Sequence, residues 1–266
     1  YIVMEIKQIP SSVFGLVGER LNYSFSRAYF GEKFDTLKLK DHQYRNFEMN
    51  REFLLSHFRE SVTYHKETST TKGKNEIIRG LNVTIPYKVD MLQVVDKLSE
   101  EVKIIGDINT TTIEDNIWTG HNTDCYGFGK SLESFLPIQK NALILGTGGA
   151  SKAVAYTLEA LQIPYLFVSR NPKDEYAIAY KEITKEAMEQ VSLIVNTTPL
   201  GVTPDIHLYP NLPYELMNES HILYDLVYNP SLTMFMKLGQ QQGAKVINGY
   251  QMLVHQAEKA WELWNN

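Results

Sequence analysis

The chain contains very little cysteine, since Cys125 is the only one among its 266 residues. A single thiol excludes an intramolecular disulfide and a zinc site built from several cysteines. It fits a reducing compartment, in which thiols stay reduced. The seven histidines show no H-x-x-x-H or comparable spacing, so we expect no bound metal.

Basic residues are not in excess either, because 26 lysines and arginines stand against 31 acidic residues, for a formal net charge of −5. A nucleic-acid binder or an electrostatic membrane clamp needs a basic surface. We therefore expect neither as a partner. Hydrophobic residues make up 43% of the chain and charged residues 21%, which is typical of a folded globular protein.

Long apolar runs are missing too, and none approaches the ~20 residues that span a bilayer. Residues 1–6 become charged too early for a secretory signal. Together with the lone thiol, this predicts a cytoplasmic protein. The sequence has no internal repeat, and its most polar stretch, residues 67–75, predicts a surface loop. The length favours two modest domains over one large domain.

The middle of the chain does carry a clear pattern. Residues 141–145 form a continuous apolar run, typical of a strand buried on both faces. Apolar residues over 150–161 then recur on one helix face. Short strands are expected at 163–168, 193–195 and 222–224. Strand and helix alternating at this spacing predict an α/β fold with a parallel sheet.

The two ends of the chain mix short strands and helices. The expected strands and helices are strands at 13–18 and 80–86 and helices at 51–59, 87–98, 232–242 and 250–264. The last helix follows the parallel unit and must pack somewhere. We expect it to return to the first domain, which makes that domain discontinuous.

A glycine turn, Gly146-Thr147-Gly148-Gly149-Ala150, joins the first middle strand to its helix. Glycine lets the backbone approach a ligand closely, and the helix N-terminus offers N–H groups to a pyrophosphate. The spacing differs from the usual G-x-G-x-x-G, and a turn that uses glycine only for shape is the alternative. The strand, the turn and the helix fall where a dinucleotide site needs them, which favours a dinucleotide.

The end of the next strand indicates which dinucleotide binds. An NAD site usually carries Asp or Glu there to accept from the ribose 2′-OH. This chain has Ser169, Arg170 and Asn171, with Lys173 close behind. Arginine offers several donors to a 2′-phosphate, so the loop favours NADP; a solvated surface arginine is the alternative.

Several polar residues do not fit a purely structural pattern. Lys88 follows Pro86 at a strand-to-helix corner, where it is either an exposed lysine or a proton donor to an oxygen that gains charge. Asp124 is either the N-cap of a helix over 125–135, the reading slightly favoured, or a carboxylate beside a substrate hydroxyl. Both choices stay open from the residues alone.

Three further polar side chains are singled out by position. Ser24 and Ser26 flank Phe25, and in an extended segment both hydroxyls would point to one side; a pair of turn serines is the alternative. Gln256 lies within the apolar stripe of the last helix. A buried amide must find partners, either in neighbouring backbone or in a polar ligand.

These segments recur in the order of a known family. They are Ser24-Phe25-Ser26, Asn82 to Lys88, Asn109-Thr110, Asn122-Thr123-Asp124, Gly146 to Ala150, Ser169 to Asn171, Asn196 to Gly201, Tyr228 to Pro230 and Gly249 to Ala257. They resemble the S-x-S, N-V-T-x-P-x-K, V-N-T, N-T-D, G-x-G-G-A, N-R-T and N-A-T-P-L-G motifs and the closing segments of the shikimate dehydrogenase family. Each match is short, but together and in register they are specific.

The resemblance implies a discontinuous α/β substrate domain, residues 1–122 and 248–266, and a Rossmann-type NADP-binding domain, residues 123–247. It implies NADPH-dependent, reversible reduction of 3-dehydroshikimate to shikimate, a small-molecule substrate, by a monomer or a homodimer. The implied proton donor or acceptor is Lys88, and Asp124 is its partner at the substrate.

The resemblance also implies two sets of binding residues. Those that contact the substrate are Ser24, Ser26, Thr84, Asn109, Tyr228 and Gln256. Those that line the cofactor site are Gly146, Thr147, Gly148, Gly149, Ala150, Ser169, Arg170, Asn171, Lys173, Thr198, Leu226 and Gly249.

The chain departs from the family's pattern near both binding regions. Tyr23 and Phe30 stand where histidines are usual, Arg27 replaces a proline, Asp107 an alanine and Ser169 an asparagine. The catalytic pair is untouched. The alternatives are an NAD-dependent quinate/shikimate dehydrogenase, a catalytically silent NADP-binding regulator, and a folate-type methylene dehydrogenase, which leaves the two serines and the glutamine without a role.

Overall fold

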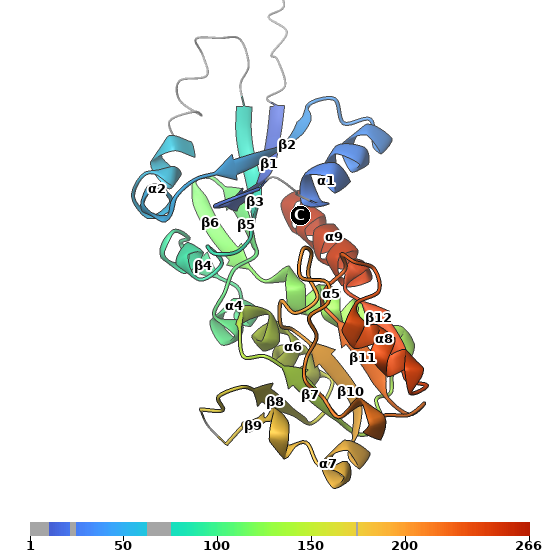
Figure 1. Ribbon diagram of the computed structural model, residues 1–266. Coiled ribbons are helices and arrows are strands. Elements are labelled where there is room, and N and C mark those ends of the chain that lie inside the picture. The colour runs from blue at the N-terminus through green and yellow to red at the C-terminus, as the bar shows by residue number, and fades with distance from the viewer. Residues whose placement is uncertain (1–10, 22–24, 63–75, 174) are drawn as a thin grey trace, which may run out of the picture. The chain divides into compact units, whose positions relative to one another are not determined.

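A computed structural model describes residues 11–21, 25–62, 76–173 and 175–266. The chain divides into two compact units, Tyr1–Asn122 with Ala260–Asn266, and Thr123–Lys259. Each unit contains one six-stranded sheet (Figure 1). The last helix, α9 (Tyr250–Asn265), is shared between the units. The domain boundaries given above remain a prediction.

The sheet of the first unit is mixed, in the order β2-β1-β3-β5-β6-β4. Its strands are β1 (Ser11–Gly18), β2 (His42–Glu48), β3 (Glu76–Val83), β4 (Lys97–Leu98), β5 (Thr110–Glu114) and β6 (Ile117–His121). β1 runs parallel to β2 and β3, whereas β5 runs antiparallel to β3 and β6. The carboxyl ends of β1 and β3 therefore meet at one edge of the sheet.

Short helices accompany this sheet: α1 (Phe25–Thr36), α2 (Arg51–Ser56), the 3₁₀ turn η2 (Asp90–Gln93) and α4 (Glu100–Ile105). Aromatic rings fill the space between α1, β1 and the end of α9. The Phe14 ring lies 4.8 Å from that of Trp264, and Phe30 lies 5.1 Å from it. The Trp264 indole N–H also donates to Thr111 O at 2.9 Å. The end of the last helix thus packs within the first unit.

The predicted helix over 87–98 is wrong. Turns at 85–89 lead into η2, and β4 begins at Lys97. Tyr87, Met91 and Val94 are buried, whereas Val89 is 57% exposed. The chain leaves the helical path because Asp96 is tied to strand β6: its N–H donates to Trp118 O, and its carboxylate accepts from Trp118 N, both at 2.8 Å.

The sheet of the second unit is parallel throughout, in the order β12-β11-β10-β7-β8-β9. Its strands are β7 (Asn141–Leu145), β8 (Tyr165–Ser169), β9 (Ala177–Ala179), β10 (Val191–Asn196), β11 (Ile222–Asp225) and β12 (Lys245–Asn248). In chain order this is 6-5-4-1-2-3, the arrangement of Rossmann-type dinucleotide-binding folds. The predicted α/β class with a parallel sheet is confirmed.

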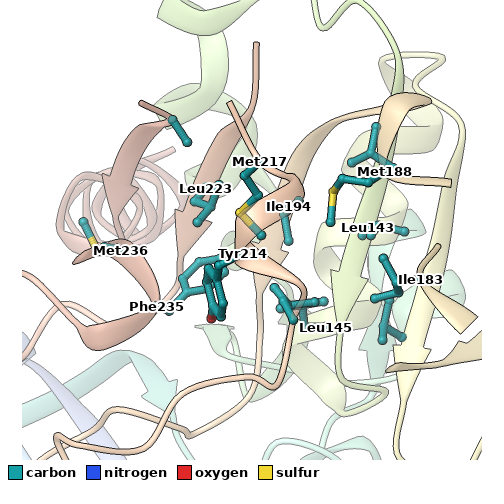
Figure 2. Close-up of a cluster of buried hydrophobic side chains, with 14 residues drawn as sticks. Leu143, Leu145, Ile183, Met188, Ile194, Tyr214, Met217, Leu223, Phe235 and Met236 are labelled. Atoms are coloured by element: carbon teal, nitrogen blue, oxygen red, sulfur yellow. The ribbon is translucent and has the colours of Figure 1, made fainter. Parts of the chain in front are cut away.

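Helices cover both faces of this sheet. They are α5 (Thr123–Leu132), α6 (Gly149–Ala160), α7 (Lys185–Glu189), α8 (Met234–Gln241) and α9, with 3₁₀ turns η3 (Glu133–Phe135), η4 (Tyr180–Glu182) and η5 (Tyr214–Leu216). Along β7, Leu143 and Leu145 join one buried cluster, shown in Figure 2, and Ala142 and Ile144 join another. Burial on both faces explains the continuous apolar run of this strand. Within the described residues, no helix has the length and apolarity to cross a membrane.

Candidate functional site

The strand order of the second unit reverses between β7 and β10. In open parallel sheets, ligands bind outside the carboxyl ends of the strands at such a point. Gly146 directly follows β7 and Thr197 directly follows β10, and the Thr197 hydroxyl donates to Leu145 O at 2.6 Å. The predicted glycine turn therefore lies at the switch point of the sheet.

The turn requires glycine at its first position. Gly146 has φ +105°, and an added Cβ would lie 3.0 Å from Thr197 Oγ1 and 3.2 Å from Thr198 Cγ2. Gly148, the N-cap of α6, has open space around an added Cβ. Among the described residues, no side chain caps α6 and no acidic residue lies in its first turn. This leaves the N–H groups and the positive end of the helix dipole for an anion, as a pyrophosphate site requires.

Strand β8 ends at Ser169, and the next residues form the predicted cofactor loop. Ser169 Oγ accepts a hydrogen bond from Asn171 N at 3.2 Å, which tightens the turn. The side chains of Arg170 and Lys173 are exposed. Burial raises the pKa of Tyr180, and the nearby Arg170 cation opposes that shift. The loop thus offers positive charge at the strand end, where an acidic residue would mark an NAD site.

Asn196, which the sequence marked only as the first residue of a motif, links two predicted cofactor residues. Its side-chain oxygen accepts from Thr198 N at 3.1 Å and from Thr198 Oγ1 at 2.6 Å, and its carbonyl accepts from Leu226 N at 3.0 Å. Its amide donates to Asp225 Oδ1 at 3.0 Å. This fully buried asparagine therefore holds the ends of β10 and β11 together. The sequence does contain a signal for this link, because the apolar strands β10 and β11 each end in a polar residue, Asn196 and Asp225.

Asp225 is a buried carboxylate behind the same loop. Thr233 Oγ1 donates to it at 2.5 Å and Val227 N at 3.1 Å, in addition to the Asn196 amide. Burial is the main influence and raises its pKa to about 6, while these three donors oppose the shift. The carboxylate stabilises loop geometry rather than facing a ligand, since it is fully buried.

Gly249 and Leu226, both predicted to line the cofactor site, are in direct contact. A Cβ on Gly249 would overlap the carbonyl of Leu226, and Gly249 N donates to Val227 O at 3.2 Å. The backbone crossing at this point explains a glycine just before α9. Tyr228, predicted to touch substrate, lies two residues on from Leu226 and is 40% exposed.

In the first unit, hydrogen bonds join the segments that carry three predicted substrate-side residues. Thr84 N donates to Val17 O at 3.0 Å, at the carboxyl end of β1. Ile108 N donates to Lys88 O at 2.9 Å, and Val83 N donates to Asn109 O at 2.8 Å. Thr84, Lys88 and Asn109 therefore belong to one corner of the sheet.

The extended conformation considered for the two serines is not found at Ser26. Ser26 is the second residue of α1, so its direction follows the helix and not an alternating strand. Its side chain is 9% exposed. Ser24 and Tyr23 lie outside the described residues, as does the polar stretch 67–75.

Asp124 and Gln256 lie on helices α5 and α9, which are in contact within the second unit. Helix α5 begins at Thr123, so Asp124 stands inside its first turn and is not the N-cap. Thr123 Oγ1 donates to Gln256 Oε1 at 3.3 Å, and the Gln256 amide donates to Leu253 O at 3.0 Å. Gln256 is 7% exposed, so the amide in the apolar stripe is indeed buried and does find partners.

Asp107, one of the departures from the family's pattern, has a specific partner. Its carboxylate accepts from the Asn122 amide at 2.6 Å, and both side chains are 3% exposed. The carboxylate thus ties the residues just before Asn109 to Asn122, a role that alanine cannot fill.

Two further points concern the predicted catalytic pair and metal binding. Lys88 belongs to the first unit and Asp124 to the second, and their pairing remains a prediction. In the part of the chain that the structure describes, no group of three or more His, Cys, Asp or Glu side chains could hold a metal ion.

Comparisons with known proteins give a consistent result. A family model described as the shikimate dehydrogenase substrate binding domain matches residues 16–111. The chain is 38% identical over 259 residues to a shikimate dehydrogenase (NADP(+)) of Clostridium beijerinckii, which covers 94% of this chain and 91% of that protein.

Solved structures show the same likeness along nearly the whole chain. A chorismate mutase/shikimate 5-dehydrogenase fusion protein from Clostridium acetobutylicum is 34% identical with a TM-score of 0.80, covering 97% of this chain and 91% of that one. A shikimate 5-dehydrogenase from Thermus thermophilus, in complex with NADP(H) and shikimate, is 30% identical with a TM-score of 0.78, covering 95% and 92%.

Proposed function

Because the chain belongs to the shikimate dehydrogenase family, we propose that it catalyses the reversible, NADP-linked reduction of 3-dehydroshikimate to shikimate. The observation that carries the proposal is likeness over nearly the whole length to NADP-dependent shikimate dehydrogenases. The glycine turn at the switch point of a Rossmann-type sheet supports it independently, since that geometry suits a dinucleotide.

The second unit supplies the residues that would hold the cofactor. The pyrophosphate would take the N–H groups at the start of α6, where Gly146 keeps the approach open. Arg170 and Lys173 would bind the 2′-phosphate, and Thr198, Leu226 and Gly249 would line the remaining wall. The bound cofactor supplies a hydride for the carbonyl carbon of the substrate.

The residues around the reacting oxygen would move and hold its proton. In the direction of reduction this oxygen gains negative charge, and the ammonium group of Lys88 donates a proton to it; in the reverse direction the amine accepts that proton. The carboxylate of Asp124 would accept a hydrogen bond from the substrate hydroxyl and hold the Lys88 side chain in place.

The remaining predicted residues would fix the substrate's orientation. Hydroxyl and amide groups suit a polyhydroxylated carboxylate because they donate and accept without adding net charge. The group comprises Ser24, Ser26, Thr84, Asn109, Tyr228 and Gln256. Asn109 and Ser26 are buried. A buried polar group without a hydrogen-bond partner destabilises the protein, so both side chains need partners from the substrate or from neighbouring residues.

The proposal includes NADP rather than NAD as the working cofactor. The end of β8 lacks the acidic residue that accepts from a ribose 2′-OH, and it carries Arg170 instead. A substrate domain of residues 1–122 and 248–266, an NADP domain of residues 123–247, a cytoplasmic location and a monomeric or homodimeric state belong to the same proposal.

A spectrophotometric assay at ~340 nm, where the reduced nicotinamide absorbs, tests the proposal. Shikimate and quinate are each combined with NADP⁺ and with NAD⁺. We expect the fastest oxidation with shikimate and NADP⁺. Faster oxidation with NAD⁺ would contradict the cofactor assignment, and binding of NADP⁺ without turnover of either acid would make the chain a silent binder.

A further inference from the structure

The link between α4 and β5, residues 107–109, is irregular and yet buried. Gly106 caps α4 with a φ of +78°, and β5 begins at Thr110. The three residues of the link, Asp107, Ile108 and Asn109, are 3%, 0% and 4% exposed. A buried segment outside helix and sheet must find a partner for each backbone polar group separately. These partners show which parts of the first unit the link holds together.

The backbone of the link bonds to the Lys88 corner and to the ends of two strands. Ile108 N donates to Lys88 O at 2.9 Å. Asn109 N donates to His121 O at 3.1 Å, at the end of β6, and Asn109 O accepts from Val83 N at 2.8 Å, at the end of β3. The lysine of the proposed mechanism is therefore in direct backbone contact with the link.

Side chains hold the link against β6. An added Cβ on Gly120 would overlap Ile108 Cδ1, so the Ile108 side chain packs directly on the strand. The Asp107 carboxylate accepts from Asn122 Nδ2 at 2.6 Å, and the same amide donates to Asp107 O at 3.4 Å. The carboxylate bond is the shortest of those described here, and a carboxylate accepts more strongly than a neutral oxygen.

Asn122 is itself well placed to hold the link. It directly follows β6 and is 3% exposed. Its backbone N–H donates to Glu101 Oε1 at 3.3 Å, on α4. The peptide group between Asp107 and Ile108 is thus held on both sides: its carbonyl and the adjacent carboxylate face the Asn122 amide, and its N–H donates to Lys88 O.

We propose that Asp107 is a positioning residue for Lys88: its carboxylate ties the link to Asn122, and the link in turn holds the lysine backbone through the Ile108 N–H. Asp107 and Ile108 share a peptide group, so a shift of the link at Asp107 moves the donor to Lys88. The family's pattern has alanine here, which makes this tie a feature of this chain. The proposal rests on the proposed function, because it takes Lys88 as the acid–base group.

Asp107→Ala and Asp107→Asn together test this role. The measurement is the single-turnover rate of NADPH formation from shikimate and NADP⁺. Asp107→Ala should lower it roughly 10-fold, since a displacement of ~1 Å near a reacting group can cost up to ~10²-fold. Asp107→Asn keeps an oxygen that accepts from Asn122 and should restore most of the rate. The KM for NADP⁺ should stay unchanged in both. A wild-type rate in Asp107→Ala, or equal losses in both variants, would contradict the proposal.

Asp96→Ala is the matched control. The Asp96 carboxylate holds the start of β6, where it accepts from Trp118 N at 2.8 Å, whereas Asp107 holds the residue after its end. Asp96→Ala also removes a bond between a carboxylate and β6, so its melting temperature should fall as well, while the single-turnover rate stays at the wild-type value. Equal rate losses in Asp96→Ala and Asp107→Ala would show a general loss of stability and overturn the proposal.

Asn122→Ala removes the same bond from the other side, which keeps the proposal testable if Asp107→Ala does not fold. It should slow NADPH formation about as much, and the double variant should be no slower than the slower single variant. A wild-type rate in Asn122→Ala, or losses that multiply, would overturn the proposal and leave the proposed function intact, because wild-type turnover of shikimate is measured in the same assay. No turnover by the wild type would instead reject both.

Discussion

Arg170 tests the cofactor assignment at the level of one side chain. It is exposed at the end of β8, and a guanidinium there can bind a 2′-phosphate through charge-assisted hydrogen bonds. We expect Arg170→Ala to raise the KM for NADP⁺ roughly 10- to 100-fold, the usual value of such bonds, and to leave the KM for NAD⁺ unchanged. Lys181→Ala, an exposed cation nearby in the sequence, is the control. Equal losses with both cofactors would contradict the assignment.

Residue types and spacing predicted the positions of single polar side chains better than the networks behind them. The strand-end position of Lys88 and the lone amide of Gln256 were visible in the sequence. The pairing that holds the loop ends together was not: Asn196 and Asp225 lie 29 positions apart. Contacts of this kind depend on strand pairing, which a single sequence does not specify.

The turn between β7 and α6 leads to a prediction about the stability effect of replacing its glycines. Gly146 has φ +105° and little room for a Cβ, whereas Gly148 has φ −84° and open space. Gly146→Ala should lower the free energy of unfolding by roughly 1–3 kcal/mol, the cost of such backbone strain. Gly148→Ala should leave it nearly unchanged. Thermal melting of the cofactor-free protein measures both, and equal melting temperatures would contradict the described turn.

The loop that follows β11 leads to a prediction about how the free energy of unfolding depends on pH. Burial raises the pKa of Asp225 to about 6, from 3.8 in the unfolded chain. Folding therefore takes up a proton between these pH values, so the stabilising effect of this carboxyl is complete below pH 4 and is lost as the pH rises through about 6.

Asp225→Asn removes that titration. From pH 4 to 7, the wild type should lose roughly 3 kcal/mol of unfolding free energy relative to the variant, which corresponds to about two pKa units. Urea denaturation at several pH values measures the difference. A difference that does not change with pH would show that Asp225 ionises in the folded protein as it does in the unfolded chain.

Whole elements were predicted well where one physical cause dominates. The strands around 141–145 and 193–195 are buried on both faces, and this burial explains the continuous apolar runs from which they were predicted. The helix expected over 87–98 failed because its apolar spacing also fits one turn followed by a loop. Long-range bonds from Asp96 to Trp118, 22 positions away, decide between the two.

At the scale of the molecule, the last helix contributes to the core of the first unit. Trp264 is 8% exposed, donates to Thr111 and occupies the space beside Gly80, where an added Cβ would overlap its ring. Trp264→Ala should cost about 3–5 kcal/mol of unfolding free energy, as for other large buried aromatics. Trp261→Ala, at a half-buried position, should cost less. A smaller loss for Trp264 than for Trp261 would contradict this packing.

The central claim is that Lys88 and Asp124 act together on the hydroxyl that is oxidised. The most direct test is a double-mutant cycle on the kcat of shikimate oxidation with NADP⁺, using Lys88→Ala, Asp124→Asn and both. Loss of a general acid–base group costs ~10²–10⁴-fold, and groups that act as a unit are not additive. We therefore expect the double variant to be no slower than Lys88→Ala alone. Losses that multiply, or a Lys88→Ala enzyme with wild-type kcat, would contradict the claim.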